Sequence, residues 1–172
     1  MPKDKVRVAV SGVGNCASAL IQGIKYYSNA KPDDVIGLLS YELGGISPDD
    51  IEFVAAFDVD KRKVGKDLSK AIFSGLNNTP KIHDVPKLGV EVQKGHVLDG
   101  LGKYLSKVIP VAEGPEVDVG SVLKESGAEI LVNYLPVGST KAVHFYATEA
   151  LRSGVALINA MPVFVASNPD PS

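Results

Sequence analysis

The sequence predicts an α/β fold, a doubly wound parallel sheet with helices on both of its faces. Three observations support this class. An alternating β-branched run over 6–11 leads directly into a glycine-rich turn. Nearly continuous apolar runs at 51–58 and 129–134 are typical of strands buried on both faces. Segments with helical spacing separate these runs, and right-handed crossovers then place the helices on both sides of the sheet.

The individual elements follow from apolar spacing and from residues that start or stop helices. We expect strands over 6–11, 51–58, 89–93, 129–134 and 155–159. We expect helices over 18–27, 60–73, 99–108, 118–125 and 139–152, with Asp60, Asp118 and Ser139 as caps. The glycine-rich segment 35–47 is either an added hairpin or a partly ordered excursion, and 163–172 forms a tail.

Composition limits the classes of function. The 172 residues suffice for one domain, and the net charge of −2 gives no reason to expect nucleic acid or an anionic membrane as a partner. The basic cluster at 61–66 is explained by a solvated helix face. No apolar run is long enough to cross a bilayer, no signal peptide precedes the first strand, and the single cysteine rules out an internal disulfide framework. We therefore expect a cytoplasmic protein, and the spacing of its histidines predicts no metal site.

The turn after the first strand carries the pattern Gly-x-Gly-x-x-Ala, which opens dinucleotide-binding units when a strand precedes it and a helix follows. Gly12 permits a tight turn, and Gly14 lets the backbone approach a pyrophosphate. Ala17 keeps the helix close to the strand. The free N–H groups and the positive dipole end of the helix then face the phosphates. The pattern thus indicates a Rossmann-type domain.

Asp58 ends the second predicted strand, where a carboxylate can accept both hydroxyls of an adenosine ribose and would repel a 2′-phosphate. This position favours NAD over NADP as the cofactor. Its separation from the glycine turn is about twice the usual ~20 residues, which an insertion at 35–47 would explain. A competing interpretation makes Asp58 a helix cap, but Asp60 fits that role better and leaves Asp58 free. The neighbouring Lys61 and Arg62 could soften the exclusion of a 2′-phosphate.

Two further strand ends are candidates for the same site, because ligands of doubly wound sheets bind at the carboxyl ends of the strands. Residues 133–138 and 159–162 each form a polar or proline-bearing turn that would border the nicotinamide half of the cofactor. The alternative is that these turns merely end strands. Cys16 lies at a predicted helix N-terminus, where a thiolate is favoured, but we interpret it as a small residue packed beside the phosphates. No catalytic constellation accompanies these turns, which is typical of a cofactor-binding half.

Six stretches of the chain resemble, in the same order, the archaeal and bacterial branch of the myo-inositol-1-phosphate synthases, also called inositol-3-phosphate synthases. They span nearly the whole chain: 12–18, 52–60, 77–79, 98–104, 133–139 and 159–164. The resemblance implies the N-terminal, NAD-binding part of an NAD-dependent isomerase of inositol and phospholipid biosynthesis. The family converts D-glucose 6-phosphate to 1L-myo-inositol 1-phosphate by oxidation at C5, aldol cyclisation and reduction.

The resemblance also implies roles for particular residues. Asp58 would hold the adenosine ribose, and Asn78 would lie on the adenine side. The pyrophosphate would be held by Gly12, Val13, Gly14, Asn15 and Cys16, and the nicotinamide side would be lined by Pro136, Val137, Asn159 and Pro162. The family's catalytic lysines and the domain that builds its oligomer, typically a tetramer, would follow Ser172. We therefore expect the chain to bind NAD without turning over glucose 6-phosphate.

Two other functions stay open. One is a stand-alone NAD-binding module that regulates a partner without catalysis, and the reading frame beyond Ser172 would decide it. The other is the cofactor domain of a different two-domain NAD(P)-dependent dehydrogenase, of the homoserine or aldehyde type, against which the ordered set of stretches argues. The chain is then a fragment, a domain cut from a longer protein, or a natural short relative.

Overall fold

A five-stranded parallel sheet forms the centre of the computed structural model, which describes residues 5–28, 30 and 35–167. The strand order is β3-β2-β1-β4-β5, and every neighbouring pair runs parallel. The strands are β1 (Val6–Ser11), β2 (Ile51–Asp58), β3 (Val92–Lys94), β4 (Ile130–Asn133) and β5 (Ala156–Asn159). This order is that of a doubly wound sheet, in which the chain reverses its direction of travel between β1 and β4. The predicted fold class is confirmed.

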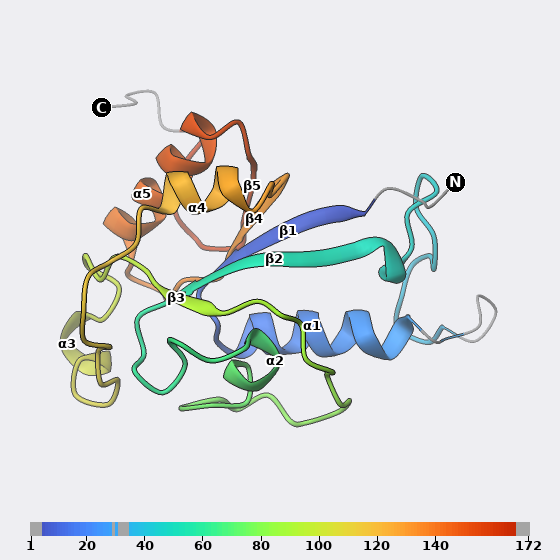
Figure 1. Cartoon of the computed structure of the whole chain (residues 1–172), viewed down its shortest axis with the longest axis horizontal. Helices are drawn as coiled ribbons and strands as arrows, with labels where there is room; N and C mark the ends of the chain where they lie inside the picture. Colours follow the sequence, from blue (N-terminus) through green and yellow to red (C-terminus); the bar gives the residue numbers. More distant parts are fainter. Residues whose placement is uncertain (1–4, 29, 31–34, 168–172) are drawn as a thin grey trace.

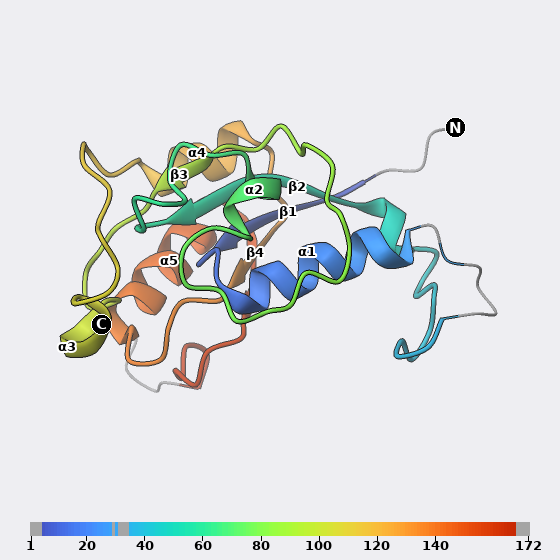
Figure 2. The same ribbon diagram turned by 90° about the horizontal axis from the view of Figure 1, so that it is seen from below.

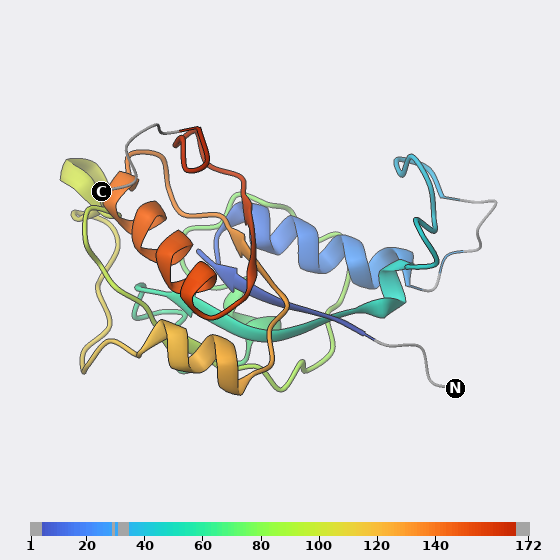
Figure 3. The same ribbon diagram turned by 90° about the horizontal axis from the view of Figure 1, so that it is seen from above.

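Helices cover both faces of the sheet (Figure 1). They are α1 (Asn15–Tyr27), α2 (Leu68–Ala71), α3 (Gly102–Leu105), α4 (Val119–Glu125) and α5 (Thr140–Arg152), with the 3₁₀ turn η1 (Pro48–Asp50) before β2. Figure 2 shows the face that carries α1 and α2, and Figure 3 shows the opposite face with α4 and α5. No helix in the described part of the chain has the length and apolar character needed to cross a membrane.

Each face has its own buried core. Val10 of β1 packs with Ile21 of α1 and Ile72 on one side, and Phe57 of β2 packs with Tyr146 of α5 on the other.

A β-bulge opposite β1 adds one residue to β2, where the register of the two strands shifts. Val8 pairs with Phe53 and Ala9 with Ala55, so Val54 has no partner in β1. Phe53 lies in the α1 core, whereas Ala55 lies in the opposite core although it is only two residues away. A regular strand would have placed both side chains on one face.

The predicted helix over 60–73 is wrong in its first half. Residues 61–65 form turns, and α2 begins only at Leu68, where Asp67 rather than Asp60 supplies the cap by accepting the N–H of Ser69. The cause is tertiary: the N–H of Gly65 donates to the carbonyl of Val92 in β3 at 2.8 Å, and the N–H of Leu68 donates to that of Val90 at 2.7 Å. Gly65 also adopts a φ of +80°, which interrupts a helix.

Other boundaries differ less. The helix expected over 99–108 is only α3, and the strand expected over 89–93 begins later, at Val92. The segment 35–47 contains bends and a single antiparallel bridge between Leu43 and Ile46, so it is not a regular hairpin. Its origin as an insertion stays a prediction. The predicted tail is described only as far as residue 167, and 168–172 lie outside the described residues.

Candidate functional site

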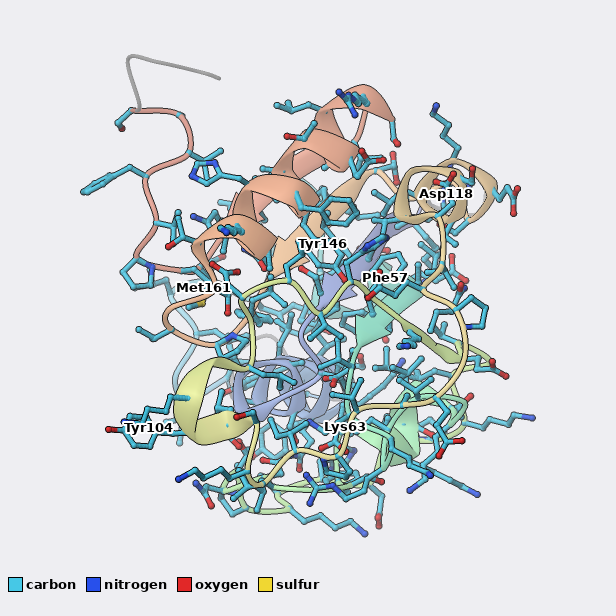
Figure 4. All side chains as sticks on the ribbon, turned by 90° about the vertical axis from the view of Figure 1, so that its left-hand side faces the viewer. Phe57, Lys63, Tyr104, Asp118, Tyr146 and Met161 are labelled. Atoms are coloured by element: carbon cyan, nitrogen blue, oxygen red, sulfur yellow. The ribbon has the colours of Figure 1, made fainter. Side chains whose placement is uncertain are left out.

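The carboxyl ends of the strands open into a pocket of ≈ 600 Å³. Figure 4 looks onto this edge, where Phe57, Tyr146, Lys63 and Met161 come from four different segments. Nine of the predicted site residues line the pocket: Gly12, Gly14, Asn15, Cys16, Asp58, Asn78, Pro136, Val137 and Pro162. The other two, Val13 and Asn159, stand behind its wall and act through hydrogen bonds described below.

The glycine turn after β1 needs its glycines for two different reasons. Gly12 has a φ of +87°, and a Cβ there would stand 2.6 Å from the carbonyl oxygen of Tyr134. Its N–H donates to the carbonyl of Phe57 at 2.9 Å, which ties the turn to β2. Gly14 has an ordinary φ of −101°, and a Cβ there would meet nothing within 4 Å. Gly12 therefore permits the fold, while Gly14 leaves the surface at the start of α1 open.

Asp58 closes the glycine turn. One carboxylate oxygen accepts the N–H of Val13 at 2.8 Å, and the other accepts the N–H groups of Val59 at 2.8 Å and Asp60 at 2.9 Å. The expectation that Asp60 caps a helix and leaves Asp58 free is thus wrong, because Asp58 itself binds the following backbone. A carboxylate has roughly four acceptor positions, and three of them are used here by backbone donors.

Lys63 completes this arrangement. Its ammonium donates to the carbonyl of Val13 at 2.6 Å and lies 3.7 Å from Asp58 Oδ2. The Lys63 side chain is only 7% exposed, which corrects the expectation that the whole basic cluster forms a solvated face. Val13 is thereby held through both its N–H and its carbonyl, so the middle of the glycine turn is fixed by one acid and one base.

The other two cations after β2 bind elsewhere. Lys61 pairs with Glu113 at 2.6 Å, and both side chains are exposed. Arg62 donates to both oxygens of Asp60, the shortest contact being 2.6 Å. Burial raises the pKa of the Asp60 carboxyl, but the hydrogen bonds and charge of Arg62 outweigh it and hold the pKa below its ordinary value. Neither cation contacts Asp58 in the described structure.

Beneath the ends of β4 and β5, the polar residues are neutral. Asn133 is fully buried, accepts the hydroxyl of Ser11 at 3.0 Å and donates to Asn159 Oδ1 at 3.0 Å. Asn159 donates in turn to the carbonyls of Met161 at 3.1 Å and Val163 at 2.9 Å. This amide chain runs from the end of β1 across the sheet to the loop after β5. It fixes that loop, and with it Pro162, against the pocket.

Asn15 and Asn78 come together although they are far apart in the sequence. The side chain of Asn15 accepts the N–H of Asn78 at 2.8 Å, and Thr79 donates to the Asn15 carbonyl at 3.0 Å. The first residue of α1 therefore holds the 77–79 loop at the rim of the pocket. This contact brings both positions to the rim of one pocket.

Sequence reasoning missed several residues of the wall. Tyr146 lines the pocket at 2% exposure, and burial together with the charge of Asp58 raises its pKa far above the ordinary value, so it is uncharged. His96 also lines the pocket and contacts Glu116 at 2.7 Å. The apolar helical spacing around Tyr146 predicts its burial, but nothing local indicates that its ring reaches a ligand site.

Cys16 borders a second, more apolar pocket. This pocket has a volume of ≈ 780 Å³, lies between α1 and the 38–51 segment, and shares Cys16 and Tyr134 with the first. Cys16 is a free, exposed thiol. In the described part of the chain, no group of three or more His, Cys, Asp or Glu side chains is arranged to hold a metal ion.

The sheet order, the glycine turn and the acid at the end of β2 define a doubly wound domain of the Rossmann type. Comparison with known proteins narrows this class. The chain is 54% identical to an inositol-3-phosphate synthase of Mycolicibacterium smegmatis over 96% of its own length and 46% of that protein. It is 48% identical to the enzyme of that name from Corynebacterium glutamicum, over 99% of its own length and 47% of that protein. The chain is therefore a homologue of the inositol-3-phosphate synthases and spans about half the length of these curated relatives.

Solved structures agree on the fold. A crystal structure of a protein named Ari2 matches 98% of this chain and 48% of its own, with a TM-score of 0.81 and 33% identity. A myo-inositol-1-phosphate synthase-related protein from Thermotoga maritima matches 96% of this chain and 50% of its own, with a TM-score of 0.67 and 22% identity. No family model matches the sequence.

Proposed function

We propose that this chain is the NAD-binding portion of an inositol-3-phosphate synthase, an isomerase that converts D-glucose 6-phosphate to 1L-myo-inositol 1-phosphate. The observation that carries the proposal is the junction of the glycine turn with Asp58, whose carboxylate lies 2.8 Å from the N–H of Val13 at the mouth of the ≈ 600 Å³ pocket. The similarity to proteins named inositol-3-phosphate synthase supports the reaction.

The residues of this edge fit a dinucleotide. The open backbone at Gly14 and the free N–H groups at the start of α1 suit a pyrophosphate, because a helix N-terminus attracts anions. We assign the phosphates to the turn formed by Gly12, Val13, Gly14, Asn15 and Cys16. Gly12 and Val13 contribute the shape of this turn, because their own N–H groups already donate to Phe57 and Asp58. We assign the nicotinamide side to Pro136, Val137, Asn159 and Pro162. Asn78 lies toward the adenine. When bound, NAD would supply the hydride acceptor and donor of the reaction.

Asp58 is assigned to the adenosine ribose, with a refinement. Because three of roughly four acceptor positions on its carboxylate are already taken by backbone N–H groups, it has room for about one ribose hydroxyl rather than two. Its main role is to fix the glycine turn and to orient the ribose against it. A negative group here disfavours a 2′-phosphate, so NAD remains the proposed cofactor.

The proposal places catalysis outside this chain. The described pocket offers a cofactor cleft, and the lysines expected to act on the sugar phosphate belong to the half of the relatives that this chain does not match. Glucose 6-phosphate as substrate, a homo-tetramer as assembly and the cytoplasm as location belong to that whole enzyme, as does its part in inositol and phospholipid biosynthesis.

Titration of the chain with NAD and with NADP tests the cofactor. We expect tighter binding of NAD and loss of that binding in Asp58→Ala. Asp84→Ala is the matched control, since Asp84 is an exposed acid that pairs with Lys81 and does not line the pocket. Equal affinity for the two cofactors would refute the role of Asp58.

The expected lack of turnover has its own assay. Incubation of the chain with NAD and glucose 6-phosphate should yield no inositol phosphate. Formation of inositol phosphate would contradict the placement of catalysis in the unmatched half.

A further inference from the structure

Among the described lysine and arginine residues, Lys63 is the most deeply buried, and it lies at the carboxyl ends of the strands. Lysine is almost never this buried without a partner, because an ammonium loses much of its hydration energy. Here the Val13 carbonyl at 2.6 Å and Asp58 Oδ2 at 3.7 Å replace part of that hydration. Lys63 also lines the pocket, and Figure 4 shows it on the open edge of the sheet. The charge of this lysine is therefore held beside Asp58, where the proposed function places the ribose.

The protein uses only part of the donor capacity of Lys63. An ammonium has three N–H donors, and the Val13 carbonyl takes one of them. Among the described residues, its other close partner is Asp58, at an ion-pair distance longer than a hydrogen bond. A ligand oxygen at the ribose position would thus meet a carboxylate and an ammonium together rather than a lone negative charge.

We propose that Lys63 is a specificity-determining residue of the cofactor site, which sets how strongly the site distinguishes a 2′-hydroxyl from a 2′-phosphate. The inference rests on the proposed NAD-binding function. A 2′-phosphate carries about two negative charges, so its binding depends strongly on the cation beside Asp58, whereas a neutral 2′-hydroxyl depends on it weakly. Lys63 therefore limits the preference for NAD that Asp58 alone would impose. Lys61 and Arg62 do not share this role, because Glu113 and Asp60 hold them elsewhere.

The test compares Lys63→Met with Lys61→Met in the 172-residue chain. Both changes remove one positive charge, so general electrostatics are matched. In Lys63→Met, we expect the dissociation constant of NADP to rise about tenfold more than that of NAD. In Lys61→Met, the ratio of the two constants should change by less than about twofold, because exposed charges are screened.

A second pair of variants covers the case in which Lys63→Met fails to fold around an unpaired Asp58. Asp58→Asn removes the acid and leaves the ammonium, and Asp58→Asn with Lys63→Met removes both charges. We expect NADP to bind about tenfold more weakly to the double variant than to Asp58→Asn. NAD should differ much less between the two.

Each outcome separates the inference from the proposed function. If both cofactors lose affinity by the same factor when Lys63 is replaced, Lys63 only supports the turn and the inference is overturned. If the unaltered chain binds neither cofactor, the proposed function itself fails. If NAD binds as expected and the ratio does not move, the proposed function stands and the role of Lys63 is refuted.

Discussion

The pocket at the carboxyl ends of the strands has two halves, one formed by β1 and β2 and the other by β4 and β5. The two halves use different kinds of polar side chain. At the carboxyl ends of β1 and β2, a half-buried acid, Asp58, and a buried lysine, Lys63, hold the backbone of Val13. Beneath β4 and β5, two neutral amides, Asn133 and Asn159, hold the loops that follow these strands. Each half fixes a loop through polar side chains with little exposure, but only in the first half are these side chains charged.

The difference matches the chemistry that we assign to each half. The phosphates keep their negative charge and the ribose stays neutral throughout a redox cycle, so fixed charges suit this half. The nicotinamide ring gains and loses a positive charge as it exchanges hydride. A neutral, hydrogen-bonded wall favours neither form strongly, which suits an isomerase that must both take and return the hydride.

Replacement of Gly12 should have the largest effect on stability, and it acts where the two halves meet. In Gly12→Ala, the new methyl group would press on the Tyr134 carbonyl while the backbone stays at a φ of +87°. We expect the free energy of unfolding to fall by about 4 kcal/mol, from strain and overpacking together. Urea denaturation followed by circular dichroism measures this. A loss below about 1 kcal/mol would mean that the halves are not locked at this contact.

Removal of the central amide tests the neutral half alone. Asn133→Ala leaves the buried Ser11 hydroxyl and the Leu135 N–H without their acceptor, while Asn159 Oδ1 keeps only the N–H of Met161. We expect a loss of about 2–3 kcal/mol, because buried polar groups without hydrogen bonds are costly. The Asp58–Val13 contact lies in the other half and should persist. If Asn133→Ala also changed the ratio of the NAD and NADP dissociation constants, the two halves would not be independent.

Asp99 brings one charge to the border of the neutral half and gives it a pH dependence. Its carboxylate accepts the N–H groups of Lys141 at 2.8 Å and Ala142 at 3.0 Å, which caps α5. Burial raises the pKa of Asp99, but these backbone donors outweigh it and lower the pKa below its ordinary value. The stabilisation is therefore present above about pH 4 and is lost as the pH falls through the folded-state pKa.

Asp99→Ala should cost about 1 kcal/mol at pH 7 and less at pH 2, because the stabilisation is lost as protons bind to the carboxyl of the unaltered chain. Denaturation curves of both proteins at the two pH values measure the difference. A cost that stays constant across this range would contradict a charged cap.

Gly14→Ala should have the smallest effect on stability and sharpens the contrast with Gly12. Its φ of −101° suits alanine, and a Cβ would meet nothing within 4 Å. Alanine reduces the freedom of the unfolded chain, which stabilises the folded protein, but it is a weaker N-cap than glycine. These two effects roughly cancel, so the free energy of unfolding should change by less than about 0.5 kcal/mol. NAD affinity should nevertheless fall about tenfold, because the methyl group would occupy the surface assigned to the phosphates. Unchanged NAD affinity would move the phosphates away from Gly14.

The sequence was sufficient for the features that local patterns encode. Near-continuous apolar runs located β2 and β4, and the cap at Asp118 located the start of α4 correctly. Helical spacing over 139–152 predicts one apolar face that includes Tyr146 and Leu151; Tyr146 is buried as expected, whereas Leu151 is 70% exposed.

Contacts between distant segments were not predictable from the sequence. Ser139 was expected to cap α5, but its hydroxyl donates to the Pro136 carbonyl, and the capping carboxylate comes from Asp99. The burial of Lys63 depends on Val13, fifty residues earlier in the chain. No local pattern distinguishes such a lysine from its exposed neighbour Lys61, because tertiary structure alone supplies the partner.

The bulge at Val54 determines on which side of the sheet Asp58 lies. In a strand, the side of a residue is a matter of odd and even counting. Counted evenly from Phe53, which lies in the α1 core, Phe57 would share that core and Asp58 would fall on the far side. The extra residue inverts the count: Phe57 lies in the opposite core, and Asp58 meets the turn before α1. The contact between Asp58 and the glycine turn therefore depends on whether β2 holds an odd or an even number of residues.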